Sequence, residues 1–176
     1  MFLHGGEGSA HVFAKSPEEP VASALEIGTA IKDHPDLRVR MGINSGPVKE
    51  VMDLNEQVNI AGAGINIAQR VMDCGDAGHI LLSKRVADDL VQYRHWQPLL
   101  HDLGACEVKH GLVVSIANLY TEEVGNPAVP AKLRHAEAGR PPAGGRQPLL
   151  TGGSVIPAVC LVVALWVFEE STDGTD

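Results

Sequence analysis

The sequence has few aromatic residues, few cysteines and little positive charge, and each shortage excludes a class of function. Aromatic residues make up 4% of the 176 residues, and the cysteines are Cys74, Cys106 and Cys160. Their wide spacing matches no zinc or redox motif, so neither a metal knuckle nor a disulfide framework is expected. Lysine and arginine number 14 against 22 acidic residues, which gives a net charge of −8. Nucleic-acid binding requires a basic surface, so no nucleic-acid partner is expected.

Apolar residues are plentiful enough for a folded core. They make up 44% of the chain and charged residues make up 20%, which is not the composition of a disordered protein. Along residues 1–120 the spacing of apolar residues alternates between the period of a strand and the period of a helix, as it does in a mixed α and β domain. Residues 121–148 are rich in proline and glycine, which predicts a linker. The chain is therefore expected to hold one domain and an appendage.

An uncharged run, residues 149–168, follows the expected linker. As a helix this run would span about 30 Å, which is the thickness of the hydrocarbon core of a bilayer. Basic residues precede it and an acidic tail, residues 169–176, follows it, so the positive-inside rule places the domain in the cytoplasm. We therefore expect a C-terminal transmembrane helix, and the alternative is a helix buried in a further domain.

Apolar spacing predicts regular elements throughout residues 1–120. Phe2 to Phe13 is typical of a hairpin, and Ser16 begins a capping-box pattern that opens a helix to about His34. Apolar and polar residues alternate from Leu37 to Ile43, as in a strand with one buried face. The remaining expected elements are a hairpin over 47–60, a helix over 64–74, a strand over 79–82, a helix over 83–93 and a strand over 113–120.

The expected helix over residues 64–74 separates its apolar and polar side chains clearly. At 100° per residue, one broad face holds Ile65, Ile67, Ala68, Val71 and Met72. Asn66 and Arg70 lie four residues apart on the other side, where neighbouring turns bring them together. An arginine in such a place offers the fixed donors that suit a phosphate, and the alternative is an ordinary solvated face.

Four motifs occur in order along residues 1–120. They are Gly6–Phe13 (GEGSAHVF), Arg40–Val48 (RMGINSGPV), Asn59–Arg70 (NIAGAGINIAQR) and Gly78–Ser83 (GHILLS). Together, and with this spacing, they resemble the catalytic domain of class III adenylate and guanylate cyclases. The resemblance implies an α+β fold with a ferredoxin-like, palm-type mixed sheet and helices packed on it. It also implies that the domain is truncated at its N-terminus, because the strand with the first metal-binding aspartate precedes these motifs in the family.

The resemblance assigns the chemistry to a few side chains. Cyclases of this class join the ribose 3′-hydroxyl to the α-phosphate of a nucleoside triphosphate and release pyrophosphate, with two Mg²⁺ or Mn²⁺ ions. Asn66 occupies the position that orients the ribose, and Arg70 the position that neutralises the phosphates. Glu7 stands where the family has its second metal-binding aspartate, and the alternative is a glutamate in a glycine-rich turn.

Three further positions follow from the same resemblance. Leu3 and Asn59 fall where the family reads the purine base; Asn59 can form a hydrogen bond to a base, whereas Leu3 cannot. Lys109 matches a lysine that often contacts phosphate in the family, and the alternative is an ordinary exposed lysine. Because base selection departs from the family pattern, the purine is not fixed by these residues.

The functional expectation is an adenylate cyclase that makes cyclic AMP from ATP, with GTP as the other candidate substrate, for signal transduction in a bacterium. The family builds its sites across a dimer interface, so a homodimer is expected, attached to the inner membrane. The chain by itself is expected to have no useful activity. One alternative is a catalytically silent dimerisation or sensory module. A diguanylate cyclase is less favoured, because Gly8 and Ser9 follow Gly5-Gly6-Glu7 where that family has an acidic residue and a phenylalanine.

Overall fold

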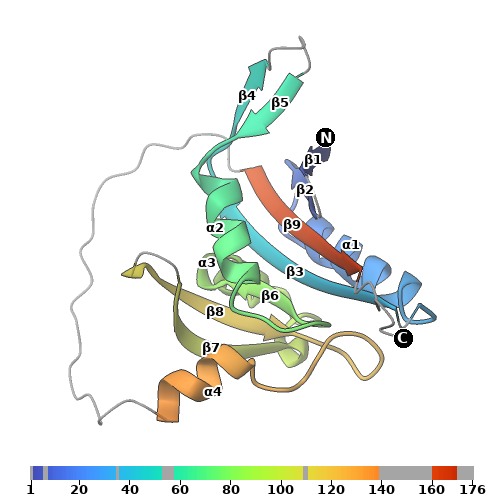
Figure 1. Cartoon of the computed structure of the whole chain (residues 1–176), viewed down its shortest axis with the longest axis vertical. Coiled ribbons are helices and arrows are strands. Elements are labelled where there is room, and N and C mark those ends of the chain that lie inside the picture. The colour runs from blue at the N-terminus through green and yellow to red at the C-terminus, as the bar shows by residue number, and fades with distance from the viewer. Residues whose placement is uncertain are drawn as a thin grey trace, which may run out of the picture.

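The computed structural model describes residues 2–5, 8–34, 36–52, 58–108, 111–138 and 160–169. Its centre is a seven-stranded mixed sheet in the order β1-β2-β9-β3-β6-β8-β7 (Figure 1). The strands of this sheet are β1 (Phe2–Gly5), β2 (Gly8–Phe13), β3 (Leu37–Gly46), β6 (Ile80–Ser83), β7 (Leu100–Glu107), β8 (Val113–Leu119) and β9 (Cys160–Glu169). The strands β4 (Lys49–Met52) and β5 (Val58–Ala61) form a separate antiparallel hairpin.

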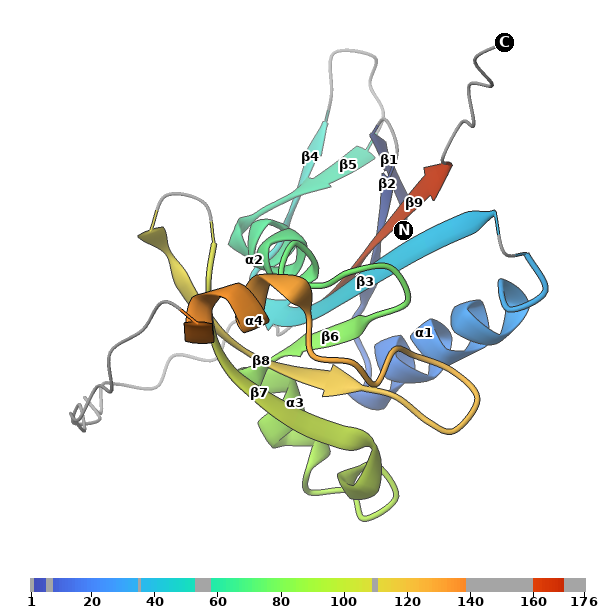
Figure 2. The same ribbon diagram turned by 60° about the horizontal axis from the view of Figure 1, so that its bottom comes forward.

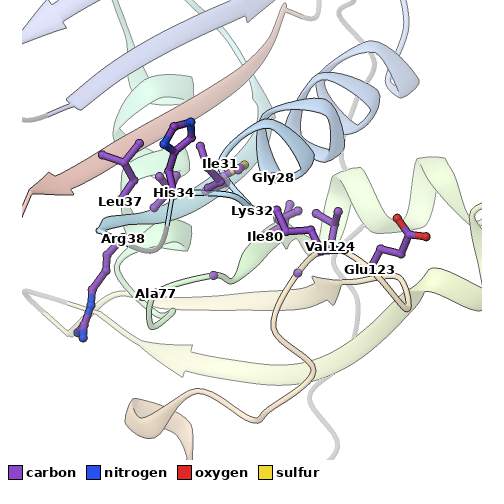
Figure 3. A pocket seen from close by; sticks show the side chains of 14 residues that line it. Gly28, Ile31, Lys32, His34, Leu37, Arg38, Ala77, Ile80, Glu123 and Val124 are labelled. Atoms are coloured by element: carbon purple, nitrogen blue, oxygen red, sulfur yellow. The ribbon is translucent and has the colours of Figure 1, made fainter.

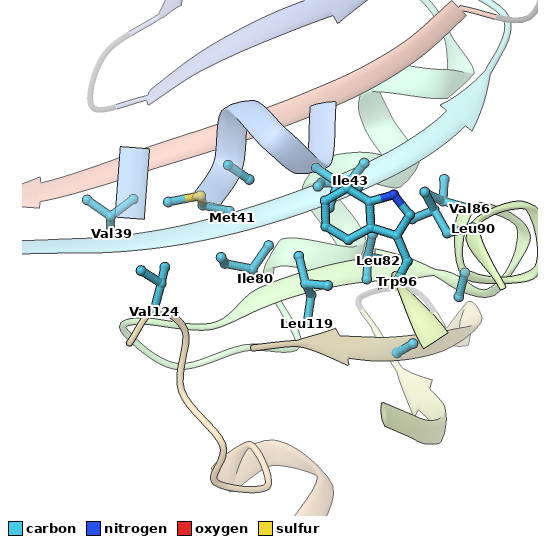
Figure 4. Close-up of a cluster of buried hydrophobic side chains, with 14 residues drawn as sticks. Val39, Met41, Ile43, Ile80, Leu82, Val86, Leu90, Trp96, Leu119 and Val124 are labelled. Carbon is cyan, nitrogen blue, oxygen red and sulfur yellow. The ribbon is translucent and has the colours of Figure 1, made fainter. Parts of the chain in front are cut away.

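Helices cover both faces of the sheet, as Figure 2 shows from the side. They are α1 (Glu18–Ala30), α2 (Ala63–Met72), α3 (Lys84–Leu90) and α4 (Ala131–Ala138), with a short 3₁₀ turn η1 (Gln97–Leu99). One buried cluster joins α1 and α3 to β3, β6 and β8, with Trp96 among its members (Figure 4). A second cluster joins α2 and α4 to β6, β7 and β8 on the opposite face. The mixed α+β architecture expected from the sequence is therefore confirmed.

Strand β6 shows why the sequence folds into layers. Ile80 and Leu82 belong to the cluster with α1 and α3, and Leu81 belongs to the cluster with α2. Successive side chains of a strand point to opposite faces, so a strand buried on both faces must be apolar throughout. Strand β3 has a different pattern from β6. Its Val39, Met41 and Ile43 belong to the first cluster, whereas Gly42 lies against Ala68 and Met72 of α2 and Arg40 bonds Gly75 beyond the end of that helix.

The expected elements of residues 1–120 are confirmed within a few residues of their bounds. Strands β1 and β2 pair antiparallel with Gly5 opposite Gly8, and β4 pairs antiparallel with β5. The expected helix from Ser16 is α1, which begins at Glu18, and the Ser16 Oγ accepts a hydrogen bond from the Glu18 N–H at 3.2 Å. The helices α2 and α3 and the strands β3, β6 and β8 also stand where the apolar spacing predicts them.

The expected transmembrane helix over residues 149–168 is wrong for its second half. Residues 160–169 form β9, which lies between β2 and β3 and pairs antiparallel with both. Both α1 and α2 contact this strand, so it is central and covered, and such strands are continuously apolar. Among the described helices, none has the length and apolar character needed to cross a bilayer. Residues 149–159 and the tail 170–176 lie outside the described residues.

The expected linker differs from the structure over residues 121–138, which pack on the domain. Val124 is buried against Gly28 of α1, and α4 follows. The buried His79 holds this segment: its Nε2 donates to the Ala128 carbonyl at 2.8 Å, and its Nδ1 accepts the Asp76 N–H at 3.0 Å. Residues 139–148 lie outside the described part of the chain.

The cysteines differ from expectation as well. Cys74, just after α2, and Cys106, in β7, form a disulfide and are both buried. The expectation that no disulfide forms is wrong for this pair, because residues 32 positions apart meet only through the tertiary fold.

Candidate active site

The predicted catalytic pair lies on the open side of α2. Gly64, Ala68, Val71 and Met72 bury the other side of this helix against the sheet. Asn66 is exposed and Arg70 is partly exposed, one turn further along. No ion pair between described residues holds Arg70. The helix therefore presents a carboxamide and a guanidinium side by side to solvent or to a partner.

A polar stripe on β3 fixes the position of α2. Asn44 Nδ2 donates to the Gly64 carbonyl at 3.0 Å, at the start of the helix. Arg40 Nη1 donates to the Gly75 carbonyl at 3.5 Å, just beyond its end. Gly42 lies between them beneath the helix. In the sequence these residues stand out only as parts of a motif. Their alternation on one face of β3 is the signal that could have identified them as positioning residues.

Gly42 allows α2 to approach β3 closely, which gives a testable consequence. A Cβ added there would lie 2.6 Å from the Met72 backbone nitrogen and would also meet the Ala68 carbonyl oxygen. Because these are backbone atoms, Gly42→Ala must move α2 away from the sheet. We expect it to lower the free energy of unfolding by about 1–3 kcal/mol, measured by urea denaturation. Ser115→Ala, at an exposed position of β8, is the control and should change it by less than about 0.5 kcal/mol.

The two predicted base-reading positions lie at one end of the domain. Leu3 is in β1, where it pairs with Ala10, and Asn59 is in β5, where it pairs with Val51. Figures 1 and 2 both place β1 and β5 at the end where α2 begins. The fold therefore brings β1 and β5, the strands that carry Leu3 and Asn59, to the end of the domain where the helix of Asn66 begins. Glu7 and Lys109 lie outside the described residues.

Metal ligands do not gather within the described part of the chain. No three histidine, cysteine, aspartate or glutamate side chains of these residues lie close enough together to hold an ion. Only Glu7 was predicted to bind a metal, and the structure does not describe it.

Two cavities are lined entirely by residues that the structure describes, and none of the six predicted site residues is in either lining. The larger, about 310 Å³, lies between the end of α1, the start of β3 and residues 123–125 (Figure 3). Its labelled apolar side chains include Ile31, Ile80 and Val124, while Arg38 and Glu123 extend outward at its two ends. Its lining also includes the polar or charged side chains of Lys32 and His34. The smaller cavity, about 280 Å³, lies at the other end of β3.

Comparison with known proteins finds a family for most of the described domain. The family model described as the adenylate and guanylate cyclase catalytic domain matches residues 21–116. This range contains β3, the β4–β5 hairpin, α2, β6 and α3, and hence Asn59, Asn66 and Arg70. No curated protein and no solved structure gives a significant match.

Proposed function

Because this chain belongs to the family of adenylate and guanylate cyclase catalytic domains, we propose that it makes cyclic AMP from ATP as one half of a dimeric site. The observation that carries the proposal is the pair Asn66 and Arg70, adjacent on the open face of a helix that β3 fixes at both ends. A dimeric site requires catalytic side chains that a second chain can reach, and these two are accessible.

In the proposed reaction the ribose 3′-oxygen forms a bond to the α-phosphorus while the bond from that phosphorus to the bridging oxygen of the β-phosphate breaks. Pyrophosphate leaves, and the 3′-hydroxyl proton passes to solvent water. Asn66 holds the ribose through its carboxamide, so that the 3′-oxygen lies in line with the leaving group. Arg70 donates to the phosphate oxygens and offsets the negative charge that grows on them.

Domains of this family generally use Mg²⁺ or Mn²⁺. The described residues do not fit such ions, because no three potential ligands come together there. No step is therefore assigned to a metal on this chain. In a dimeric site the metal carboxylates can belong to the other half, and the test below supplies them in that way.

The proposal is tested by mixing the whole chain with a disabled family domain. That partner keeps its metal carboxylates, but alanine replaces its own asparagine and arginine at the positions equivalent to Asn66 and Arg70. We expect neither protein alone to turn over ATP or GTP with Mn²⁺. The mixture should form a 3′,5′-cyclic nucleotide and pyrophosphate in equal amounts, measured by mass spectrometry.

A catalytically silent dimerisation module is the second candidate, because Leu3 offers no hydrogen bond to a purine at a predicted base-reading position. The same mixture separates the two functions. A heterodimer seen by gel filtration that yields no cyclic nucleotide would favour the silent module and would contradict the proposed activity.

A further inference from the structure

The disulfide joins the helix that carries the predicted catalytic pair to the edge of the sheet. Cys74 follows the end of α2 and lies one turn beyond Arg70, and Cys106 lies near the end of β7. In the sheet order β7 is the last strand, where it pairs with β8. The bond therefore fastens the Arg70 end of α2 to an edge strand.

Hydrogen bonds from β3 hold this end of α2 less firmly than they hold its start. At the start, Asn44 donates to the Gly64 carbonyl at 3.0 Å, a usual length for such a bond. At the end, the bond from Arg40 to the Gly75 carbonyl is 3.5 Å, which is long and weak. The buried apolar side of the helix contacts the sheet directly and does not need the disulfide. Loss of the disulfide should therefore loosen the end of α2 without unfolding the helix.

Each sulfur has a hydrogen-bond acceptor ready for the reduced state. The Cys74 Sγ lies 3.4 Å from the Arg70 carbonyl oxygen, and the Cys106 Sγ lies 3.8 Å from the Glu107 carbonyl oxygen. A thiol is a weak donor, and a buried donor without a partner is costly. After reduction both thiols can donate to these oxygens with little movement. The fold can therefore accommodate the pair as a disulfide or as two thiols.

A reductant can reach the sulfurs only when this part of the protein opens locally, because Cys74 and Cys106 are both 1% exposed. The structure of β7 favours such opening. This strand lies at the edge of the sheet, and its pairing with β8 shifts register between Asp102 and Gly104, just before Cys106. Segments with few buried contacts open at a lower free energy than the core of a domain. Exchange should therefore proceed through opening of β7 rather than through unfolding of the whole domain.

We propose that Cys74 and Cys106 form a reversible thiol–disulfide switch that sets how firmly the Arg70 end of α2 is held. A thiolate of a dithiol reductant attacks the Cys106 Sγ and breaks its bond to the Cys74 Sγ, which takes a proton and becomes a thiol. The second thiol of the reductant then releases Cys106 as the other thiol and closes the reductant's own disulfide. Two electrons and two protons pass to the protein, and the reverse exchange with an oxidised dithiol restores the bond.

The test is amide hydrogen exchange of the whole chain, followed by NMR with and without dithiothreitol. The amides of Asp73, Cys74 and Gly75 donate to the last carbonyls of α2, and we expect them to exchange about tenfold faster or more after reduction. The amide of Asn66, at the start of the helix, should change much less. Cys106→Ala should show the faster exchange without reductant and should not respond to it.

The matched control is Cys160→Ala, which removes the cysteine outside the disulfide. It should respond to dithiothreitol as the unsubstituted chain does. In this variant every thiol that reacts with an alkylating reagent comes from the disulfide, so mass spectrometry after alkylation measures the rate at which the bond opens. That rate should exceed the rate of global unfolding under the same conditions.

The consequence for turnover rests on the proposed function. In the mixed dimer, reduction should lower the rate of cyclic-nucleotide formation about tenfold, because a small displacement of a positioned group is costly. Cys106→Ala should have the lower rate in both conditions, which controls for effects of the reductant on the partner.

Three results would overturn the switch. One is a bond that opens only as fast as the whole domain unfolds, which would make it a permanent structural link. Another is exchange at Asp73 to Gly75 that reduction changes no more than exchange at Asn66. The third is an active mixture whose rate does not respond to reduction. A mixture that is inactive in both states would instead contradict the proposed function, and the exchange measurements would still decide whether the bond holds α2.

Discussion

Arg70→Ala is expected to lower cyclic-nucleotide formation by the mixed dimer about 100- to 1,000-fold, the usual cost of removing one well-placed donor to developing charge. The expected effect on stability is small, because the guanidinium is partly exposed and the buried side of α2 does not include Arg70. The measurements are the initial rate of product formation and the melting temperature. Arg94→Ala, another exposed arginine, is the control and should retain the full rate.

If Arg70 had only a structural role, a different result would be expected. Arg70 is the basic residue in the last turn of α2, where the interaction of a positive charge with the helix dipole stabilises the helix by about 0.3–1 kcal/mol. If that were its whole contribution, Arg70→Ala would cost this much stability and leave the rate unchanged. Such a pair of results would mean that the side chain has been assigned the wrong role.

Ala164→Pro is expected to destabilise the whole domain, because Ala164 lies in the middle of β9 between Ala10 of β2 and Gly42 of β3. Proline removes a backbone donor and is excluded from central strands. We expect a loss of roughly 3 kcal/mol in the free energy of unfolding, the scale of a proline inside regular structure. Urea denaturation followed by circular dichroism of the whole chain measures it.

The control for β9 is Ala164→Ser, which keeps the backbone N–H and changes the side chain little. It should cost much less than proline at the same position. Membrane helices tolerate proline, because neighbouring groups satisfy the freed carbonyl. An unfolding free energy that proline leaves unchanged would therefore contradict the placement of β9 in the sheet.

The elements around the candidate site could be predicted because local pattern and tertiary burial agree there. In α2, the apolar side chains repeat at helical spacing, and the same side packs on the sheet. In β3, apolar residues alternate with Arg40, Gly42 and Asn44, and the two sets face different layers. The role of those three residues was not predictable, because it depends on how closely α2 approaches the strand.

The misjudged segments are those whose structure depends on distant partners. A central strand and a membrane helix can both be uncharged and apolar, so residues 160–168 did not distinguish them. Residues 121–138 contain many helix and strand breakers, yet His79 and Gly28 anchor them from far away in the sequence. The Cys74–Cys106 pair likewise depends on the meeting of α2 and β7.

The most direct test of the central claim is the rate of cyclic-nucleotide formation when the whole chain carries both Asn66→Ala and Arg70→Ala. In the mixture with the disabled partner, no intact asparagine and arginine pair then remains, although the amount of heterodimer seen by gel filtration should be unchanged. We predict that the rate falls to that of the disabled partner alone. A mixture that forms the cyclic product as fast as with the unsubstituted chain would contradict the assignment of this helix face to the active site.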